Sequence, residues 1–410
     1  MPNPIDTPDQ RRIELEALKV YADLRVQATI ADRRSYWLEK ARPSAGQRRA
    51  FDSYFEEAVF GSLLWTLNTD PERPAVLTIS RIPHKLGDVH VPGTRWGIDN
   101  PDSVYRTIPI SGAERYVIRG RVHYPRLTEN YFTLWNANMG TVDVLDGKSL
   151  VLEKDGSFEI FVDSDGKGNR ANHVRSSPEA VEFYIRDVVT DWANERPSEL
   201  SIERLGGAPK KPERSFDQKV ADAQALIIKN VDNTIRWNRQ ALDKPVNMFD
   251  FVIDRDTDGA LRNQVYIMGH FNLQDDEGLL IDVDLGGAAY FIAPITNLWG
   301  TTNDIVHENG SLNLTQMKRD SDGTVRLLVS RKDPGIWNWL DTHDMQDGIM
   351  TLRWAEFETG RPNANLKATG KVIKLADVAK ELPKSVKVTP AERKKQLEER
   401  ARSYLWRIAE

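Results

Sequence analysis

The chain contains no cysteine, and this absence removes several kinds of chemistry at once. Without thiols the protein can form no disulfide, no thiolate nucleophile and no thiolate metal site. The seven histidines are scattered along the sequence, and no pair has the spacing of a zinc site. Motifs for nucleotides and activated serines are missing too, since there is no GxxxxGK[ST], no GxGxxG after a strand and no GxSxG elbow. The sequence therefore predicts no cofactor and no metal centre.

Long hydrophobic runs are also missing. No stretch approaches the roughly 18 apolar residues that span a bilayer, and the start lacks the basic and apolar regions of a secretory signal. Basic residues do not dominate either, because 56 Lys and Arg stand against 61 Asp and Glu. That balance gives no large basic face for phosphate groups. We therefore expect a cytoplasmic protein that binds neither membrane nor nucleic acid.

One segment has part of a calcium-binding pattern. Asp254, Asp256, Asp258 and Gly259 match the first half of a calcium loop. The twelfth position is Val265, where the pattern needs a bidentate acid. A hairpin turn is the alternative interpretation, and we expect no metal there.

The residues that are present divide the chain into five parts. Apolar residues recur at helical spacing in residues 1–72, and short apolar runs between turn residues indicate β-strands in 73–207. Residues 208–245 contain a polar linker and a helix, and 246–382 return to strands. In residues 383–410, Thr389 and Pro390 begin a helix whose charged stretch Lys394–Arg402 is expected to face solvent. Leu405 and Ile408 are expected to dock on the body or on another subunit, which leaves a homo-oligomer open.

The two strand-rich parts resemble each other. Asp155–Val162 and Asp322–Val329 both place Asp-Gly before an apolar strand, and Val181–Arg186 matches Gly348–Arg353 at the same offset of 167 residues. Between these segments, Asn172-His173 lies opposite Asn338-Trp339. We predict an α+β fold that is mostly antiparallel β, with two tandem sandwich-like (jelly-roll-type) β domains. Each domain is preceded by helices, and a C-terminal helix follows.

Two groups of residues are candidates for a site. The first surrounds a strand entry and combines carboxylates with aromatic, amide and guanidinium groups: Trp96, Asp99, Asn100, Asp102, Tyr105 and Arg119. The second is the loop after Asp333-Pro334-Gly335, with Trp337, Asn338, Trp339, Asp341 and His343. Asp102, Tyr105, Asp341 and His343 are the candidate acids and bases. The other members except Asp99, together with Asn297 and Trp299, are candidate substrate-binding residues. Because both groups lie at strand ends of their repeats, we predict that Asp102, Tyr105 and Arg119 share one cavity with residues of the 333–343 loop. Both groups also suit plain turns and core packing.

The second half resembles a known family. The order Asn297-Leu298-Trp299, Asp322-Gly323, Asp333-Pro334-Gly335, Asn338-Trp339-Leu340-Asp341 and Arg353-Trp354 resembles the bacterial family catalogued as domain of unknown function 1214. The earlier segment Asp99–Tyr105 is similar to that family too, so scattered motifs cover about residues 95–355. The segment Thr301-Thr302-Asn303 departs from the family pattern. The resemblance implies a sheet-rich sandwich with helices and no settled activity.

Two classes of function fit these residues. One is a cofactor-independent lyase or hydrolase that acts on a small hydroxylated molecule through carboxylate and histidine acid–base chemistry. The other is a non-catalytic β-sandwich that binds a glycan or other small ligand. A carboxylate with a strongly raised pKa inside the main pocket is expected for the enzyme and not for the binding protein.

Overall fold

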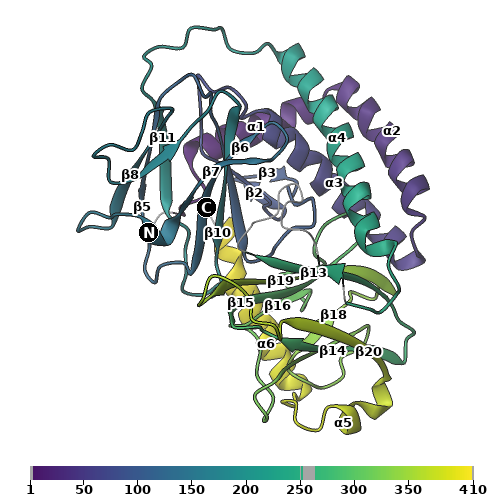
Figure 1. Ribbon diagram of the computed structural model, residues 1–410. Coiled ribbons are helices and arrows are strands. Elements are labelled where there is room, and N and C mark those ends of the chain that lie inside the picture. Colours follow the sequence, from purple (N-terminus) through teal and green to yellow (C-terminus); the bar gives the residue numbers. More distant parts are fainter. Residues whose placement is uncertain (1–2, 250, 253–263, 409–410) are drawn as a thin grey trace.

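The computed structural model describes residues 3–249, 251–252 and 264–408. Within these ranges the chain forms a helical layer, two β-sandwiches and a C-terminal helix (Figure 1). The predicted class, α+β with mostly antiparallel sheets in two tandem β domains, is confirmed. None of the helices in these ranges is long and apolar enough to cross a membrane.

Four long helices make the helical layer. They are α1 (Pro8–Tyr21), α2 (Leu24–Ala41), α3 (Ala45–Thr66) and α4 (Phe216–Leu242). Each begins after a residue whose side chain accepts a hydrogen bond from a backbone N–H of the first turn: Thr7, Asp23, Ser44 and Ser215. In Figure 1, α4 lies beside α2 and α3, although more than 140 residues separate it from α3 in sequence. The helices predicted at the start of the chain and after the linker are both present.

The first sandwich consists of a five-stranded and a four-stranded sheet. The larger sheet has the order β1 (Leu77–Ile79), β4 (Ser103–Pro109), β10 (Ala180–Val188), β6 (Glu129–Asn136), β7 (Thr141–Asp146). The smaller has the order β11 (Glu199–Arg204), β5 (Tyr116–Arg121), β8 (Ser157–Asp163), β9 (His173–Arg175). A separate hairpin joins β2 (His84–Leu86) and β3 (Val89–Val91).

The second sandwich repeats this arrangement. Its larger sheet has the order β12 (Phe251–Val252), β13 (Val265–Asn272), β19 (Asp347–Phe357), β15 (Ala288–Thr296), β16 (Ser311–Asn313). Its smaller sheet, read in the same sense as the first, is β20 (Lys367–Lys374), β14 (Glu277–Asp284), β17 (Val325–Ser330), β18 (Trp339–Asp341). In chain order the described strands of the two sandwiches therefore correspond one to one, from β1 with β12 to β11 with β20. The hairpin β2–β3 is an insertion between β1 and β4 of the first sandwich.

Local geometry supports the same correspondence. Gly156 and Gly323 have φ of 81° and 83°, which glycine adopts readily. Each follows an aspartate whose side chain accepts a hydrogen bond from the backbone N–H of the residue after the glycine. In both sandwiches the last strand of the smaller sheet pairs in parallel, and His173 and Trp339 hold equivalent positions in that pairing. The predicted match between the two Asp-Gly turns is therefore present in three dimensions.

The central strands of each larger sheet are buried on both faces. Phe183 and Ile185 on β10 point into the first sandwich, and Met350 and Leu352 on β19 point into the second. The alternate residues of the same strands point outward, as the two-residue period of a strand requires. These outer faces pack against each other and against the helices. Nearly every residue of the central strands is therefore buried.

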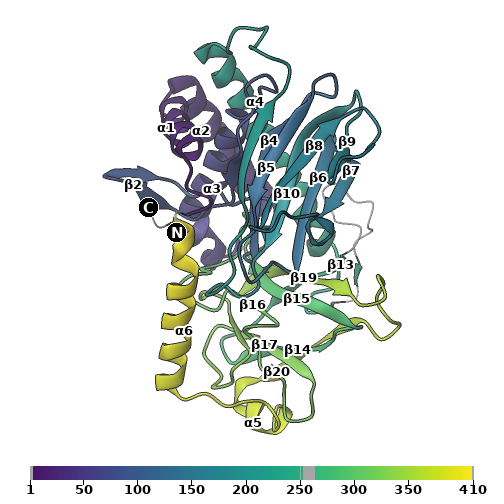
Figure 2. The same cartoon turned by 90° about the vertical axis from the view of Figure 1, so that its left-hand side faces the viewer.

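The C-terminal helix α6 (Pro390–Tyr404) runs along the second sandwich and ends beside the N-terminus (Figure 2). The predicted cap at Thr389 is present, with Glu392 completing the reciprocal pair of hydrogen bonds. The expectation of a solvated charged face is wrong in part, because Arg400 within that stretch is buried and donates to Ile305 O. The docking expectation also changes: Ile408 packs at the junction, whereas Leu405 is 38% exposed. A short helix, α5 (Val378–Glu381), precedes α6.

Candidate functional site

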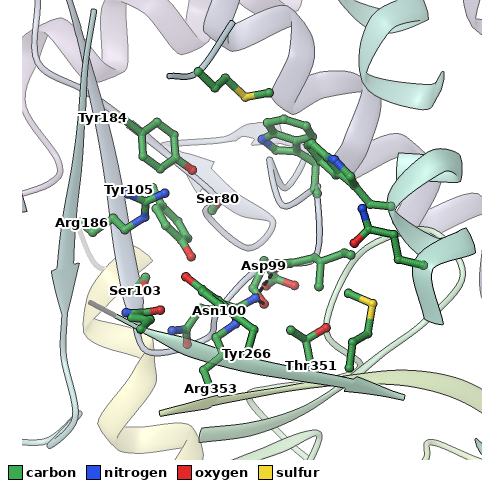
Figure 3. Close-up of a pocket in the computed structure, with 18 of the residues that line it drawn as sticks. Ser80, Asp99, Asn100, Ser103, Tyr105, Tyr184, Arg186, Tyr266, Thr351 and Arg353 are labelled. Atoms are coloured by element: carbon green, nitrogen blue, oxygen red, sulfur yellow. Dashed lines mark hydrogen bonds between the residues drawn. The ribbon is translucent and has the colours of Figure 1, made fainter. Parts of the chain in front are cut away.

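A cavity of about 150 Å³ lies where the outer faces of the two larger sheets meet the helices. Strands β4, β6 and β10 supply lining residues from the first sandwich, β13 and β19 from the second, and α3 and α4 from the helical layer. Figure 3 shows labelled side chains of this lining. The loop 96–100 completes the lining. Cavities at such junctions are common sites for small ligands.

The loop that carries Trp96 is fixed by the packing around it. Gly97 has φ of 67°, and a Cβ there would lie 3.1 Å from the Trp237 ring on α4. Ile98 N donates to Gly300 O at 2.7 Å, which ties the loop to the second sandwich. Glycine is therefore required at position 97 by both conformation and space.

One wall of the cavity is aromatic. Trp96 contacts Trp65 and Trp237, with ring centroids 5.4 and 5.7 Å away. Trp65 lies 5.8 Å from Tyr184, which stacks on Trp135 at 4.2 Å. Four of the chain's eleven tryptophans thus line this one cavity. A planar or apolar ring would find a continuous contact surface here.

The other wall is polar, and it is built from equivalent positions of the two sandwiches. Tyr105 on β4 pairs across the sheet with Arg186 on β10. Tyr266 on β13 pairs in the same way with Arg353 on β19. All four line the cavity (Figure 3). The duplication has therefore placed the same tyrosine–arginine pair on two sides of one space.

Arg353 is 6% exposed and has no ion pair with a carboxylate of the described chain. Its Nη2 donates to Ile98 O at 2.5 Å and to Asp99 O at 3.2 Å. Burial by itself lowers the pKa of Arg353, but nearby Tyr105, Tyr266 and Asp99 outweigh burial and raise it. The guanidinium is a fixed positive charge at the cavity.

Asp99 is the one carboxylate among the described residues that line this cavity. Its Oδ1 accepts hydrogen bonds from Thr302 N at 2.6 Å and from Thr302 Oγ1 at 2.9 Å. These bonds hold the loop against the second sandwich. The contacts of Oδ1 are structural.

Several carboxylates whose pKa burial raises lie elsewhere. Burial raises the pKa of Asp102 to about 6, of Glu182 to about 7 and of Glu129 to about 8. It also raises that of Asp341 to about 7. None of the four is among the residues that line the cavity. Glu182 lines a neighbouring space and accepts a hydrogen bond from Trp65 Nε1 at 2.9 Å.

The first predicted group is only partly brought together. Trp96, Asn100 and Tyr105 line the cavity. Asp102 is fully buried behind it and accepts hydrogen bonds from Trp192 Nε1, Asn313 Nδ2 and the Tyr290 hydroxyl. Its position joins the two sandwiches.

The prediction that Arg119 shares this cavity is wrong. Arg119 lies on β5, in the smaller sheet, and its side chain is 47% exposed. It forms ion pairs with Glu159 and Glu203 on the neighbouring strands. Because β5 belongs to the opposite layer of the sandwich, Arg119 faces solvent on the far side.

The loop 333–343 is also outside the cavity, so the predicted common cavity of the two groups is wrong. Trp339 is buried, and its Nε1 donates to Ser330 O at 3.1 Å. Asn338 bonds the backbone of Lys318 and Arg326, as an amide that joins strands does. These contacts agree with the structural interpretation of the loop.

The remaining members of that loop lie nearer the surface. Trp337 is half-buried and carries Lys318 Nζ 3.5 Å from its ring centroid. Asp341 Oδ1 accepts a hydrogen bond from His343 N. His343 bonds Glu308, which raises the pKa of the histidine. Asp341 and His343 thus form a small charged cluster apart from the main cavity.

Asn297 and Trp299 are buried in packing contacts. Asn297 bonds Thr301 within its own turn, and Trp299 Nε1 donates to Gln47 O at 3.0 Å. The Trp299 ring packs against Trp37 and Phe51. Trp299 thus fixes the second sandwich to the helices, whereas Asn297 fixes its own turn, and neither residue lines the cavity.

Several lining residues were missed from the sequence: Trp65, Trp135, Tyr184, Arg186, Trp237, Tyr266 and Arg353. One signal for two of them was present. The matched runs Val181–Arg186 and Gly348–Arg353 both end in arginine at the offset of 167 residues. A charged residue that recurs at equivalent positions of buried strands indicates a site more specifically than the surrounding apolar pattern does.

No group of three metal-ligating side chains forms a cluster in the described ranges. The calcium-like segment from Asp254 lies outside them, apart from Val265, so its prediction stays a prediction.

Comparison with known proteins bears on the fold alone. No protein-family model matches the chain, and no curated protein does either. Among solved structures, an uncharacterized protein from Burkholderia cenocepacia is similar, with a TM-score of 0.71 and 23% identity. The similarity covers 88% of this chain and 99% of that one. The VPA0106 protein from Vibrio parahaemolyticus gives a TM-score of 0.44 at 12% identity over 68% of this chain and 90% of that one, too little to carry an argument.

Proposed function

We propose that this protein binds a small ring-shaped organic molecule in the cavity between its two sandwiches. The observation that carries the proposal is the lining itself, with four tryptophans and three tyrosines around one space. Aromatic walls with a few polar groups are typical of small-ligand sites. A cavity of about 150 Å³ is the size that holds one six-membered ring.

The same residues favour binding over acid–base catalysis. The carboxylates with pKa raised to about 6 to 8 are Asp102, Glu129, Glu182 and Asp341, and none lines the cavity. Asp102 in particular accepts three hydrogen bonds and has no contact with the cavity. A lyase or hydrolase stays a prediction, as do the cytoplasmic location, the homo-oligomer and membership of the domain of unknown function 1214 family.

The expected affinity is modest. A ring compound of about nine non-hydrogen atoms, at roughly 0.4–0.8 kcal/mol per atom, gains about 4–7 kcal/mol, which corresponds to a Kd between about 10 µM and 1 mM. Stacking on the tryptophans should also change their fluorescence. Binding is therefore measurable by titration calorimetry and by tryptophan emission.

A substitution that fills the cavity tests this proposal. Thr351 lines the cavity and is 2% exposed, so Thr351→Met should occupy the space that a ring would use. We expect one-ring compounds to bind the unaltered protein and to bind Thr351→Met at least tenfold more weakly. Trp337→Phe, at a tryptophan outside the cavity, is the control and should bind normally. Equal binding by the two variants would place any ligand elsewhere and defeat the proposal.

A further inference from the structure

Arg353 is a buried charge whose hydrogen-bonding capacity is incompletely used. Its acceptors are the carbonyl oxygens of Ile98 and Asp99, both reached from Nη2. No described residue accepts a hydrogen bond from its Nε. An uncompensated buried guanidinium is unfavourable, and an anion that accepts from it would offset that loss.

A buried arginine without an ion pair does not by itself indicate a ligand site, because Arg407 is buried in a similar way. Arg407 donates to Pro101 O and Asp102 O and has an unused Nε as well. It lies at the C-terminal junction, however, and lines no cavity described for the chain. Arg353 differs because a ligand-sized space adjoins it (Figure 3).

The charges around the cavity favour an anion. Its described lining residues include two arginines, Arg186 and Arg353, and one carboxylate, Asp99. Asp99 uses Oδ1 for two hydrogen bonds to Thr302. Among the described lining residues, arginines therefore outnumber carboxylates by one.

The polar wall also has the right donors for a carboxylate. Tyr105 and Tyr266 bring phenol groups beside the arginines of their own sheets. A guanidinium offers a planar fork of N–H donors, and a phenol adds an O–H donor. Carboxylate oxygens accept such bonds in pairs, whereas a neutral amide presents one acceptor and two donors.

The structure assigns this cavity to a small ring compound that carries a carboxylate, with the ring against the tryptophan wall and the carboxylate on Arg353. The assignment rests on the proposed function and names the chemical class of its ligand. Trp65, Trp96 and Trp237 provide the apolar contact, and Arg353 with the two tyrosines provides the polar one. The two ends of the ligand thus match the two walls.

The experiment compares acids with their neutral amides. Benzoate, phenylacetate and cyclohexanecarboxylate are titrated into the full-length protein beside benzamide, phenylacetamide and cyclohexanecarboxamide, at pH 7.5 and low salt. We expect at least one acid to bind, and to bind tenfold or more tightly than its amide. Equal or tighter binding by the amides would overturn the carboxylate assignment and leave the ring-binding proposal intact. Failure of all six compounds would overturn both.

A variant then tests the anchor. Arg353→Gln should weaken binding of the acid by tenfold or more and change binding of the amide by less than threefold. Arg353→Lys, which keeps the charge and loses the fork, should give an intermediate value. Arg119→Gln is the matched control, because Arg119 is an exposed strand arginine on the far sheet. Acid binding that survives in a folded Arg353→Gln protein would contradict the role of Arg353. The comparison of acids with amides in the unaltered protein decides the ligand class whether or not that variant folds.

Discussion

At the scale of single residues, equivalent positions of the two sandwiches hold side chains with different tasks. His173 on β9 bonds Asp163 at 3.1 Å, whereas Trp339 at the matching position of β18 fills the space under its loop. Arg393 from α6 lies 5.0 Å above the Trp339 ring. The second sandwich therefore uses a large aromatic side chain where the first uses a polar contact.

Trp339→Ala should destabilise the protein strongly. The side chain is 6% exposed and its Nε1 donates to Ser330 O, so truncation leaves a cavity and removes one hydrogen bond to that carbonyl group. We expect a loss of about 3–5 kcal/mol in the free energy of unfolding, measured by urea titration. Trp337→Ala, at a half-buried site, should lose less. Ring-ligand binding should persist in both folded variants, and its loss in Trp339→Ala alone would instead make Trp339 part of a site.

Asp341→Asn should change how stability depends on pH. Burial raises the pKa of Asp341 from 3.8 to about 7, so the folded protein holds this proton more tightly than the unfolded chain. The stability from this group is fully present below about pH 4 and is lost as the pH rises through 7. The variant should therefore lose less stability between pH 4 and 8 than the unaltered protein, and should still bind ring ligands. Parallel pH profiles would show that Asp341 titrates normally.

At the scale of elements, α6 is attached through arginines of its charged sequence. Arg393 donates to both oxygens of Asp333, at 2.9 and 3.2 Å, and to the carbonyl oxygens of Ile336 and Trp337. Its side chain is 6% exposed, whereas that of Lys394 is 79% exposed. Adjacent basic residues thus have opposite environments, which the helical angle of about 100° per residue produces.

Arg393→Ala should destabilise the protein much more than the same change at the exposed Lys394. Removing the Arg393 side chain breaks the ion pair with Asp333 and takes one donor from each of two carbonyl groups, so we expect a loss of about 2–4 kcal/mol in unfolding free energy. Lys394→Ala, one residue along the same helix, should change it by less than about 0.5 kcal/mol. Chemical denaturation of both variants tests the difference. Equal effects would mean that α6 contributes little through Arg393.

At the scale of the whole molecule, the sandwiches are joined by a buried polar group. The Tyr290 hydroxyl, on β15, donates to Asp102 at 3.1 Å and accepts from Asn100 Nδ2 at 2.9 Å. Asn313, from β16 of the same sandwich, donates to Asp102 as well. Such bonds fix the orientation of one sandwich on the other, because few other arrangements satisfy all the donors.

Tyr290→Phe should weaken this junction. Loss of the hydroxyl removes one buried hydrogen-bond partner from Asn100 and one from Asp102, and we expect a loss of about 1–3 kcal/mol in unfolding free energy. Thermal and urea unfolding measure it. Tyr124→Phe, at a tyrosine that is 71% exposed, is the control and should be nearly neutral. A neutral Tyr290→Phe would mean that apolar packing alone holds the sandwiches together.

The sequence by itself determined the elements and their repetition. Helical spacing, turn residues and alternating strands act over a few residues, so Thr389-Pro390, Asp155-Gly156 and Asp322-Gly323 could be assigned from local pattern. The match of Val181–Arg186 with Gly348–Arg353 gave the duplication, because equivalent strands of repeated units keep their register. Those features depend on neighbours in the chain.

Tertiary structure alone decided which residues share a space. Arg119 and Tyr105 are close in sequence, but they lie on different sheets, so one faces solvent and the other the cavity. Arg186 and Arg353 are far apart in sequence, yet the docking of two outer sheet faces brings both to one cavity. Docking depends on the side chains of entire faces and on the helices that cover them. For that reason local patterns located the strands but could not say which of their faces would meet.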